Sequence, residues 1–418
     1  MKRALGYVLF CALVLLSGAG ALAQNAIELR FLCFNDGNEC AVYADLLSRF
    51  SLDNPDIIVV VEVVDAADIE AQLSAQADAG AAPDIARVAD FGALAGDYLD
   101  LRSLLSDADS FAASFQAPFL QAMRAGAGDA LHGFPDAAAM VAPFVNVSLF
   151  ERANVSLPGA GASWDEWLAA LDDVAAATEA SYALAVDNKD HRLVGPAMSL
   201  GAQYFDADRN LTLADDDGLR AFLEILHALM IEGKTPADTL LGTGASQETF
   251  TRGDAVMYIC GSWKVEEVAA QVGDDFDWAI VANPSGSGGR TGVAQATALV
   301  ALAGTDHPAA VAQVFEHLAQ PDVYAEFSAR ALTIPAHLGV AASAIDYGTE
   351  SETIAAALNA FARETLNLQE QAITLDLHPL ADVYYEASNA TLRAFFSGEL
   401  SLDEALTSLK ARLREAAS

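Results

Sequence analysis

The sequence has 418 residues and a formal net charge of −36, and 53% of its residues are hydrophobic. This length is enough for two domains with separate cores, and the hydrophobic content excludes an intrinsically disordered chain. No basic cluster occurs, so nucleic acid and anionic membrane surfaces are not expected as partners. The acidic residues are spread along the chain, which is typical of a solvated surface, although this acidity also permits a cationic ligand.

Residues 1–23 have the features of a cleaved export signal. Lys2 and Arg3 precede an apolar stretch at 4–16, and residues 21–23 (Ala-Leu-Ala) form a small-x-small cleavage site. No later apolar run is long enough to span a bilayer. We therefore expect the mature protein in the periplasm or another extracytoplasmic space.

Three cysteines remain after this signal is removed, namely Cys33, Cys40 and Cys260. In an oxidising compartment a nearby pair should join, and Cys33 and Cys40 bracket one short polar loop. We expect a disulfide between these two; the alternative is three reduced, buried cysteines. No metal site is expected, because no CxxC or HxxxH spacing accompanies them.

The first ninety residues alternate between strand and helix patterns. Strands are expected at 26–34, 57–64 and 84–88, and helices at 41–50 and 68–78. This order predicts a doubly wound α/β sheet that binds its ligand outside the carboxyl ends of the strands. Polar side chains stand at two of those ends: Asn35, Asp36, Arg87 and Asp90.

The rest of the chain continues the alternation. The expected strands are 141–147, 182–186, 255–260, 276–282 and 295–302, and the expected helices are 111–123, 163–177, 195–203, 219–232, 245–252, 308–319 and 321–332, with further helices to the end. Residues 187–192 are expected to form a polar loop that contains Arg192. The acidic run at 215–217 is interpreted as the cap region of a helix instead of a metal site.

The stretch from Phe250 to Trp263 organises the second half of the chain. Gly253 ends a helix, since glycine takes a left-handed conformation without a Cβ penalty. A buried strand then ends at Gly261, and Trp263 follows on the turn. A large aromatic beside a glycine at a strand end is typical of a ligand edge in an α/β sheet. The alternative is that Trp263 belongs to the core.

This stretch also carries a resemblance. The spacing Phe250-x-x-Gly253-Asp254-Ala255-Val256-Met257, followed by Gly261-x-Trp263, resembles the extracellular solute-binding proteins of family 1, the maltose-binding type. Residues 131–135, 334–335 and 402–406 resemble further segments of that family, so the likeness covers nearly the whole mature chain. Members of the family are the substrate-binding components of ABC sugar importers.

The resemblance implies a periplasmic-binding-protein-like fold, in which two α/β lobes face each other across a ligand cleft. The expected N-terminal lobe comprises 24–136 and 295–340, and the expected C-terminal lobe comprises 141–290 and 345–418. Hinge crossovers are expected at 136–140, 284–295 and 336–347.

The resemblance also implies roles for particular residues. Asp90 occupies the place of a hydroxyl-binding carboxylate, Trp263 that of a stacking aromatic, and Tyr385 that of a second aromatic. Asp36 matches the polar first loop, and Tyr384 and Tyr385 begin a late helix. Arg192 is expected on a loop that faces the same cleft. The alternative for each Asp is a solvated loop or a helix cap.

No catalytic motif accompanies these residues. The sequence lacks GxSxG, HExxH and SxxK, so we expect a binding protein without a cofactor. The principal hypothesis is a monomeric receptor that binds a mono- or oligosaccharide and delivers it to an ABC transporter permease. A receptor of the same fold for a cationic ligand such as a polyamine remains open, and a secreted hydrolase is a more distant alternative.

Overall fold

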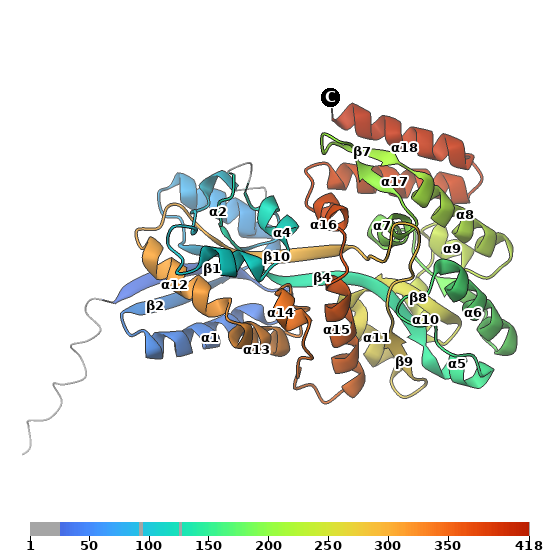
Figure 1. Cartoon of the computed structure of the whole chain (residues 1–418), viewed down its shortest axis with the longest axis horizontal. Helices are drawn as coiled ribbons and strands as arrows, with labels where there is room; N and C mark the ends of the chain where they lie inside the picture. Colours follow the sequence, from blue (N-terminus) through green and yellow to red (C-terminus); the bar gives the residue numbers. More distant parts are fainter. Residues whose placement is uncertain (1–25, 92–94, 125–127, 418) are drawn as a thin grey trace, which may run out of the picture.

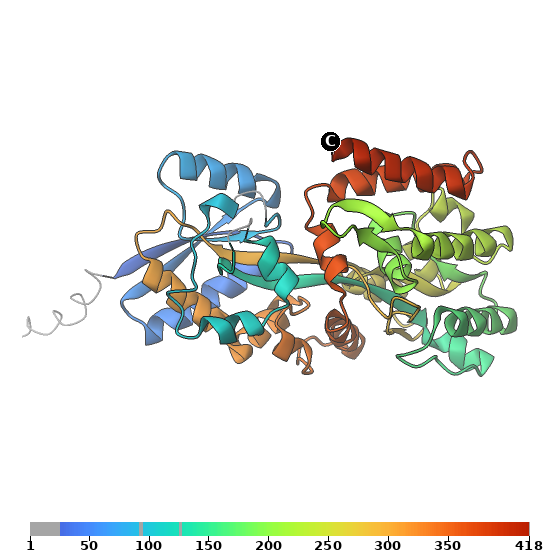
Figure 2. The same ribbon diagram turned by 45° about the horizontal axis from the view of Figure 1, so that its top comes forward.

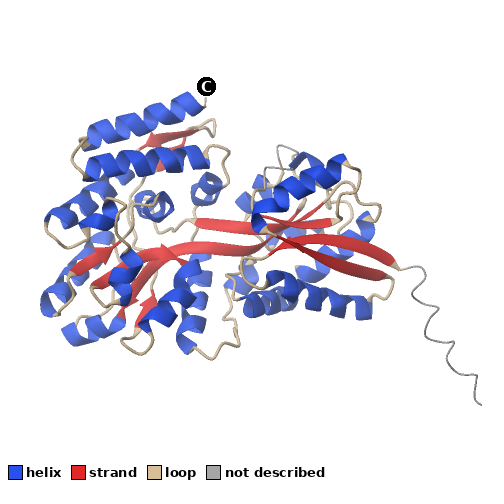
Figure 3. Cartoon of the chain, turned by 180° about the vertical axis from the view of Figure 1, so that it is seen from behind, coloured by secondary structure: helices blue, strands red, loops and turns tan. Residues whose placement is uncertain are grey.

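The computed structural model describes residues 26–91, 95–124 and 128–417; the expected export signal lies outside them. Two lobes lie along the long axis of the molecule, joined by two strands that run from one lobe into the other (Figure 1, Figure 3). One sheet passes through both lobes in the order β2-β1-β3-β10-β4-β8-β5, with β9 paired to β4. The bounds of its strands are β1 (Ile27–Phe34), β2 (Ile57–Val64), β3 (Ile85–Val88), β4 (Gly133–Asn146), β5 (Tyr182–Ala185), β8 (Ala255–Gly261), β9 (Trp278–Ile280) and β10 (Ala294–Ala301).

The N-terminal lobe forms around the parallel strands β1, β2 and β3. The apolar side chains of β1, β3 and the neighbouring helices bury one core. The strand expected at 57–64 is present, but β2 is the edge strand of the sheet instead of a buried one, and Ile58, Val60 and Val63 are exposed. The helices of this lobe are α1 (Glu39–Asp53), α2 (Ile69–Asp78), α3 (Ala108–Ala113), α4 (Ala117–Ala122), α12 (Pro308–Leu318), α13 (Pro321–Ala331) and α14 (Leu338–Ala341).

One correction concerns residues 111–123, which were expected to form a single helix. The structure divides this region into α3 and α4. Phe115, which lies between them, forms a β-bridge with His337, and Pro118 lies in the first turn of α4. Proline lacks the amide hydrogen that a continuous helix needs, so the chain restarts its helix there.

The C-terminal lobe packs helices on both faces of β4, β8 and β5 (Figure 2). Its helices are α5 (Val147–Ala153), α6 (Trp164–Ala177), α7 (Asp190–Ser199), α8 (Asp217–Ile231), α9 (Ala237–Leu240), α10 (Ser246–Thr251), α11 (Val265–Val272), α15 (Glu352–Thr365), α16 (Glu370–Asp376), α17 (Ala381–Phe396) and α18 (Leu402–Ala416), with a short 3-10 turn η3 (Ser262–Lys264).

The sequence prediction misplaced α7 and missed a hairpin. The helix expected at 195–203 begins five residues earlier, inside the expected polar loop. It ends at Ser199, and the expected last residue, Gln203, belongs instead to β6 (Gln203–Phe205), which pairs with β7 (Leu211–Asp215). Asp206 closes this hairpin by accepting hydrogen bonds from the backbone and side chain of Asn210.

Strands β4 and β10, called the crossing strands below, connect the lobes. β4 pairs with β10 over Gly133–Met140 and with β8 over Val141–Val145, so the expected crossover at 136–140 lies inside one continuous strand. The register shifts between Thr297 and Ala298, which leaves Asp136 as the extra residue of a β-bulge. A bulge bends its strand and redirects a side chain, and here it directs Asp136 into the N-terminal lobe.

Candidate ligand-binding site

Trp263 lies on η3, directly after β8. The side chain of the preceding residue, Ser262, accepts a hydrogen bond from the backbone N–H of Met140 on β4, at 3.2 Å. This bond fixes the turn against a crossing strand. Trp263 is 43% exposed, whereas the other three tryptophans, Trp164, Trp167 and Trp278, are buried. The ring of Trp263 is therefore presented at the surface beside the junction of the lobes and is outside both hydrophobic cores.

Gly261 allows the Trp263 ring to lie against the end of β8. A Cβ atom at position 261 would lie 1.9 Å from the ring. Glycine is needed here for this close approach, since its backbone is in an ordinary extended conformation. The ring of His191 on α7 lies 5.5 Å from that of Trp263. Burial, together with Arg192 and Lys189, lowers the pKa of His191 to about 4, so this neighbour is uncharged at neutral pH.

Tyr385 lies on α17 and is partly buried. Its hydroxyl donates to Asp376 Oδ1 at 3.0 Å, and Gln295 Nε2 on β10 donates to the same oxygen at 3.3 Å. Burial raises the pKa of Asp376 to about 6, although both hydrogen bonds act in the opposite direction. Sequence reasoning named Tyr385 but missed Asp376 and Gln295, which become neighbours only through the fold.

Two of the expected ligand residues are structural in this lobe. Tyr384 is 1% exposed, and its hydroxyl donates to that of Tyr204 at 3.3 Å, so its ring is part of the core. Arg192 is 5% exposed; it forms an ion pair with Asp187 and donates to Cys260 Sγ at 3.3 Å. Both side chains support α7 and α17 in this structure, and a ligand contact by either of them stays a prediction.

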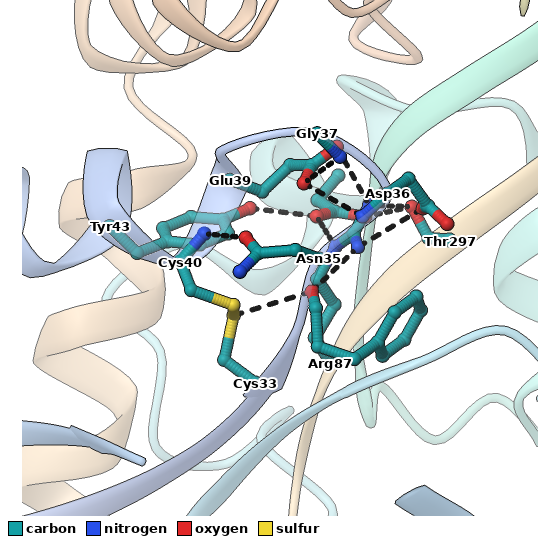
Figure 4. Close-up of a disulfide and its surroundings, with 11 residues drawn as sticks. Cys33, Asn35, Asp36, Gly37, Glu39, Cys40, Tyr43, Arg87 and Thr297 are labelled. Carbon is teal, nitrogen blue, oxygen red and sulfur yellow. Dashed lines mark hydrogen bonds and ion pairs between the residues drawn. A yellow bond between two sulfur atoms is a disulfide. The ribbon is translucent and has the colours of Figure 1, made fainter. Parts of the chain in front are cut away.

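The loop after β1 is held rigidly from several sides (Figure 4). Cys33 and Cys40 form the expected disulfide, and Cys260 is free and buried. Asn35 Oδ1 accepts from the backbone of Cys40 at 2.9 Å, and the buried carboxylate of Glu39 accepts from the backbone of Asp36 at 3.0 Å. These bonds fix the loop with the side chains of Asn35 and Asp36 exposed. The sequence did not indicate that Glu39 would hold this loop.

Arg87 is the centre of a buried charge network below this loop. It is 1% exposed and forms an ion pair with Asp36 at 3.2 Å (Figure 4). A second ion pair joins it to Asp136 at 2.8 Å. Its remaining donors reach the carbonyl of Phe34 at 3.0 Å and Thr297 Oγ1 at 2.9 Å. Every hydrogen-bonding nitrogen of its guanidinium is engaged within the protein, so the structure gives Arg87 a supporting role, and its contact with a ligand stays a prediction.

Asp136 shares its carboxylate among three donors. It accepts from Arg87, from the Tyr43 hydroxyl at 2.9 Å and from the Thr297 hydroxyl at 2.6 Å. The carboxylate is fully buried and lies on the bulge of β4. A buried charge needs such pairing and hydrogen bonding, so the network ties the first loop to both crossing strands.

Asp90 follows β3 and is exposed. Its charge, second to burial, raises the pKa of Tyr98, which places the carboxylate near that ring. Asp90 thus lies at the carboxyl end of β3, and Asp36 lies close to the carboxyl end of the adjacent β1. The expected polar edge of the N-terminal lobe is therefore present at two neighbouring strand ends.

One face of β10 connects the two halves of the site. Alternate residues of a strand point to the same side, so Thr297 and Gln295 share a face. Thr297 accepts a hydrogen bond from Arg87, which forms an ion pair with Asp36. Gln295 donates a hydrogen bond to Asp376, which also accepts one from the Tyr385 hydroxyl. Helix α7 links Trp263 to these residues. His191 of α7 contacts the Trp263 ring, and α7 packs against α16 and α17, which carry Asp376 and Tyr385.

The comparisons with known proteins agree with this architecture. Residues 45–358 match the family described as "Bacterial extracellular solute-binding protein". The chain belongs to this family. No curated protein matches the sequence. Within the described residues, no helix has the length and apolar character needed to cross a bilayer.

Solved structures of several solute-binding proteins share the fold. The sugar-binding protein MalE of Xanthomonas citri is 19% identical, with a TM-score of 0.76, over 93% of this chain and 97% of that one. A cyclic α-maltosyl-1,6-maltose binding protein of Arthrobacter globiformis is 18% identical, with a TM-score of 0.75, over 93% and 98%. A sugar transporter of Rhizobium etli in an open conformation is 20% identical, with a TM-score of 0.74, over 93% and 99%. These likenesses confirm the periplasmic-binding-protein-like α/β fold.

Two other features lie away from this site. A surface groove of about 590 Å³ runs between α13 and residues 339–348, and none of the candidate residues lines it. The carboxylates of Asp215, Asp216 and Asp217 lie within 4.8 Å of one another at the start of α8. Lys410 forms an ion pair with Asp216 at 3.0 Å, which fits the expected cap region better than a metal site.

Proposed function

We propose that this protein is a monomeric, extracytoplasmic receptor that binds a carbohydrate between its lobes and delivers it to the permease of an ABC importer. The observation that carries the proposal is Trp263, an exposed ring held on Gly261 at the junction of the lobes. An aromatic face suits the C–H face of a pyranose, and a few polar groups placed around it suit the sugar hydroxyls. Asp36, Asp90 and Tyr385 supply such groups at neighbouring element ends.

The similar structures support a sugar over the alternatives, since they include a sugar-binding protein and a cyclic α-maltosyl-1,6-maltose binding protein. His191, the ring beside Trp263, is uncharged at neutral pH, which is compatible with an uncharged ligand. We propose a binding role instead of a catalytic one, because the matching family and the similar structures are binding proteins.

We also propose that the lobes close on the ligand about the crossing strands. Asp36 and Asp90 belong to one lobe and Trp263 and Tyr385 to the other, so one ligand meets all four in a closed form. The ligand then shifts the population toward closure by its difference in affinity for the two forms.

A thermal-shift screen of the mature protein tests the function. The panel comprises maltose, maltotetraose, other oligosaccharides, spermidine and amino acids. A ligand at 100 times its Kd stabilises by about 2.7 kcal/mol, which raises the melting temperature by several degrees. We expect a sugar to give the largest increase. An increase with spermidine alone would overturn the carbohydrate proposal in favour of a cationic ligand.

A further inference from the structure

Asp376 occupies the point where the candidate site, a crossing strand and both lobes meet. It is the last residue of α16, which packs against α4 of the N-terminal lobe and against β10 (Figure 1). Its Oδ1 atom accepts hydrogen bonds from the Tyr385 hydroxyl at 3.0 Å and from Gln295 Nε2 at 3.3 Å. The register pairs Gln295 with Ala139 on β4, next to Met140, which holds the turn of Trp263. One carboxylate therefore connects the two aromatic residues to the same stretch of the crossing strands.

The second oxygen of this carboxylate, Oδ2, differs from Oδ1 in its hydrogen bonding. Among the described residues none donates a hydrogen bond to Asp376 Oδ2, and this atom is not one of the fully buried unpaired polar atoms. A carboxylate that is largely removed from water but keeps one oxygen accessible is a strong acceptor for a hydroxyl, since hydrogen bonds to ionised groups exceed neutral ones in strength.

From this arrangement we infer that Asp376 is a ligand-binding and positioning residue, in which Oδ1 fixes Tyr385 and Oδ2 accepts a hydroxyl hydrogen of the bound sugar. This inference rests on the proposed function and adds a carboxylate that the sequence did not indicate. The Tyr385 ring is then not free to rotate away from the crossing strands, because its hydroxyl is held from α16.

The charges around Asp376 set how the site responds to pH. Burial raises its pKa to about 6, the hydrogen bonds from Gln295 and Tyr385 lower the pKa, and Asp382 on α17 raises it. The other elements packed on α16 add little charge near Asp376. α4 and β10 carry no titratable residue, and Tyr204 of β6 accepts a hydrogen bond from Tyr384. On α7, Arg192 is paired with Asp187 and His191 is uncharged at neutral pH.

The proposed hydrogen bond from the sugar to Oδ2 determines how affinity changes with pH. A hydroxyl that donates to Oδ2 favours the ionised form, so sugar binding lowers the pKa of Asp376 and affinity falls when the carboxyl is protonated. Affinity should therefore be constant above about pH 7 and decrease several-fold between pH 7 and pH 5. Asp376→Asn keeps an acceptor for Tyr385 but removes the charge, so it should bind about tenfold more weakly at pH 7.5, with little change between pH 7 and pH 5.

The test measures maltotetraose affinity by calorimetry from pH 5 to 7.5 in wild type, Asp376→Asn and Asp382→Asn. Asp382→Asn is the matched control, because it removes one exposed carboxylate on the neighbouring helix. It should keep wild-type affinity at pH 7.5 and keep the decrease in affinity, shifted slightly to lower pH because Asp382 raises the pKa of Asp376. Equal affinity and equal pH dependence in wild type and Asp376→Asn would overturn the inference while leaving the proposed function intact.

A second measurement needs no sugar. Fluorine NMR of protein containing 3-fluorotyrosine, with the Tyr385 signal assigned through Tyr385→Phe, should show a transition near pH 6 that Asp376→Asn abolishes. If maltotetraose fails to bind wild type, the affinity measurement uses the sugar that gives the largest thermal shift, and this signal decides the positioning role separately. A Tyr385 signal that does not respond to pH near 6 would overturn the inference.

Discussion

The two halves of the candidate site are built on opposite principles. On the N-terminal side, Asp36 is held by Arg87, which is buried together with Asp136 in a network of charges below a disulfide-linked loop. On the C-terminal side, Trp263 is held by packing on Gly261 and by a hydrogen bond of its turn to β4, with no charge partner. We therefore expect changes around Arg87 to affect the stability of the protein, and a change of the Trp263 ring to affect binding alone.

The largest effect is expected from Asp136→Ala. This substitution leaves the Arg87 guanidinium buried without its main partner, which typically costs about 3–5 kcal/mol of unfolding free energy. Urea unfolding followed by circular dichroism measures the loss. The matched control is Asp36→Ala, which removes another partner of Arg87, but one whose side chain is 61% exposed. That variant should lose less than about 1 kcal/mol. Equal losses in the two variants would show that the network is not organised around Asp136.

Trp263→Ala should give the next largest effect, on binding instead of folding. Loss of a central aromatic contact typically costs about 2–4 kcal/mol, which weakens affinity by roughly 30- to 1,000-fold. Unfolding free energy should stay close to that of wild type, because the ring is half exposed. Trp167→Ala is the contrasting variant: its ring is 1% exposed, and its loss should cost about 3–5 kcal/mol of stability. Unfolding of Trp263→Ala would instead place that ring among the structural residues.

Removal of the disulfide comes third. Cys33 and Cys40 are separated by seven positions, and a loop of that size contributes about 2.5 kcal/mol in the chain-entropy account. The double variant Cys33→Ser/Cys40→Ser should lose about that much stability in urea unfolding. Thiol counting on denatured, unreduced wild type should find one free thiol, from Cys260. A count of three free thiols would contradict the bridge.

Gly261→Ala should have the smallest effect on stability and an informative effect on binding. The new Cβ requires the Trp263 ring to move, but the ring is at the surface and has room to turn away, so folding should change by less than about 1 kcal/mol. Affinity for the bound sugar should fall about tenfold in calorimetry. Gly159→Ala, in an exposed loop where a Cβ meets nothing within 4 Å, is the control and should leave both quantities unchanged.

Much of the fold was predictable, because local patterns decide its elements. The β-branched run at 57–64 and the apolar run at 255–260 have the composition of strands, although only the second is buried. The capping boxes at Ser163 and Ser401 mark two helix starts that the structure confirms. Trp263 was also predictable, since a glycine two residues before an aromatic at a strand end is visible in the sequence.

The remaining parts of the site depend on distant contacts. Arg87, Arg192 and Tyr384 have the chemistry of ligand residues, but partners far along the chain bury them, and sequence shows polarity without showing those partners. Asp136 owes its role to a bulge set by the pairing of β4 with β10. Asp376 and Gln295 are 81 positions apart and meet only because α16 packs on β10.

The most direct test of the account is acrylamide quenching of tryptophan fluorescence during a titration with maltotetraose. Trp263 is the exposed member of the four tryptophans, so it should dominate the quenching of wild type. A sugar that stacks on this ring should reduce the quenching constant in step with saturation measured by calorimetry, and Trp263→Phe should show weak quenching that the sugar does not change. Saturation with maltotetraose at unchanged quenching of wild type would contradict a ligand bound against Trp263 between the lobes.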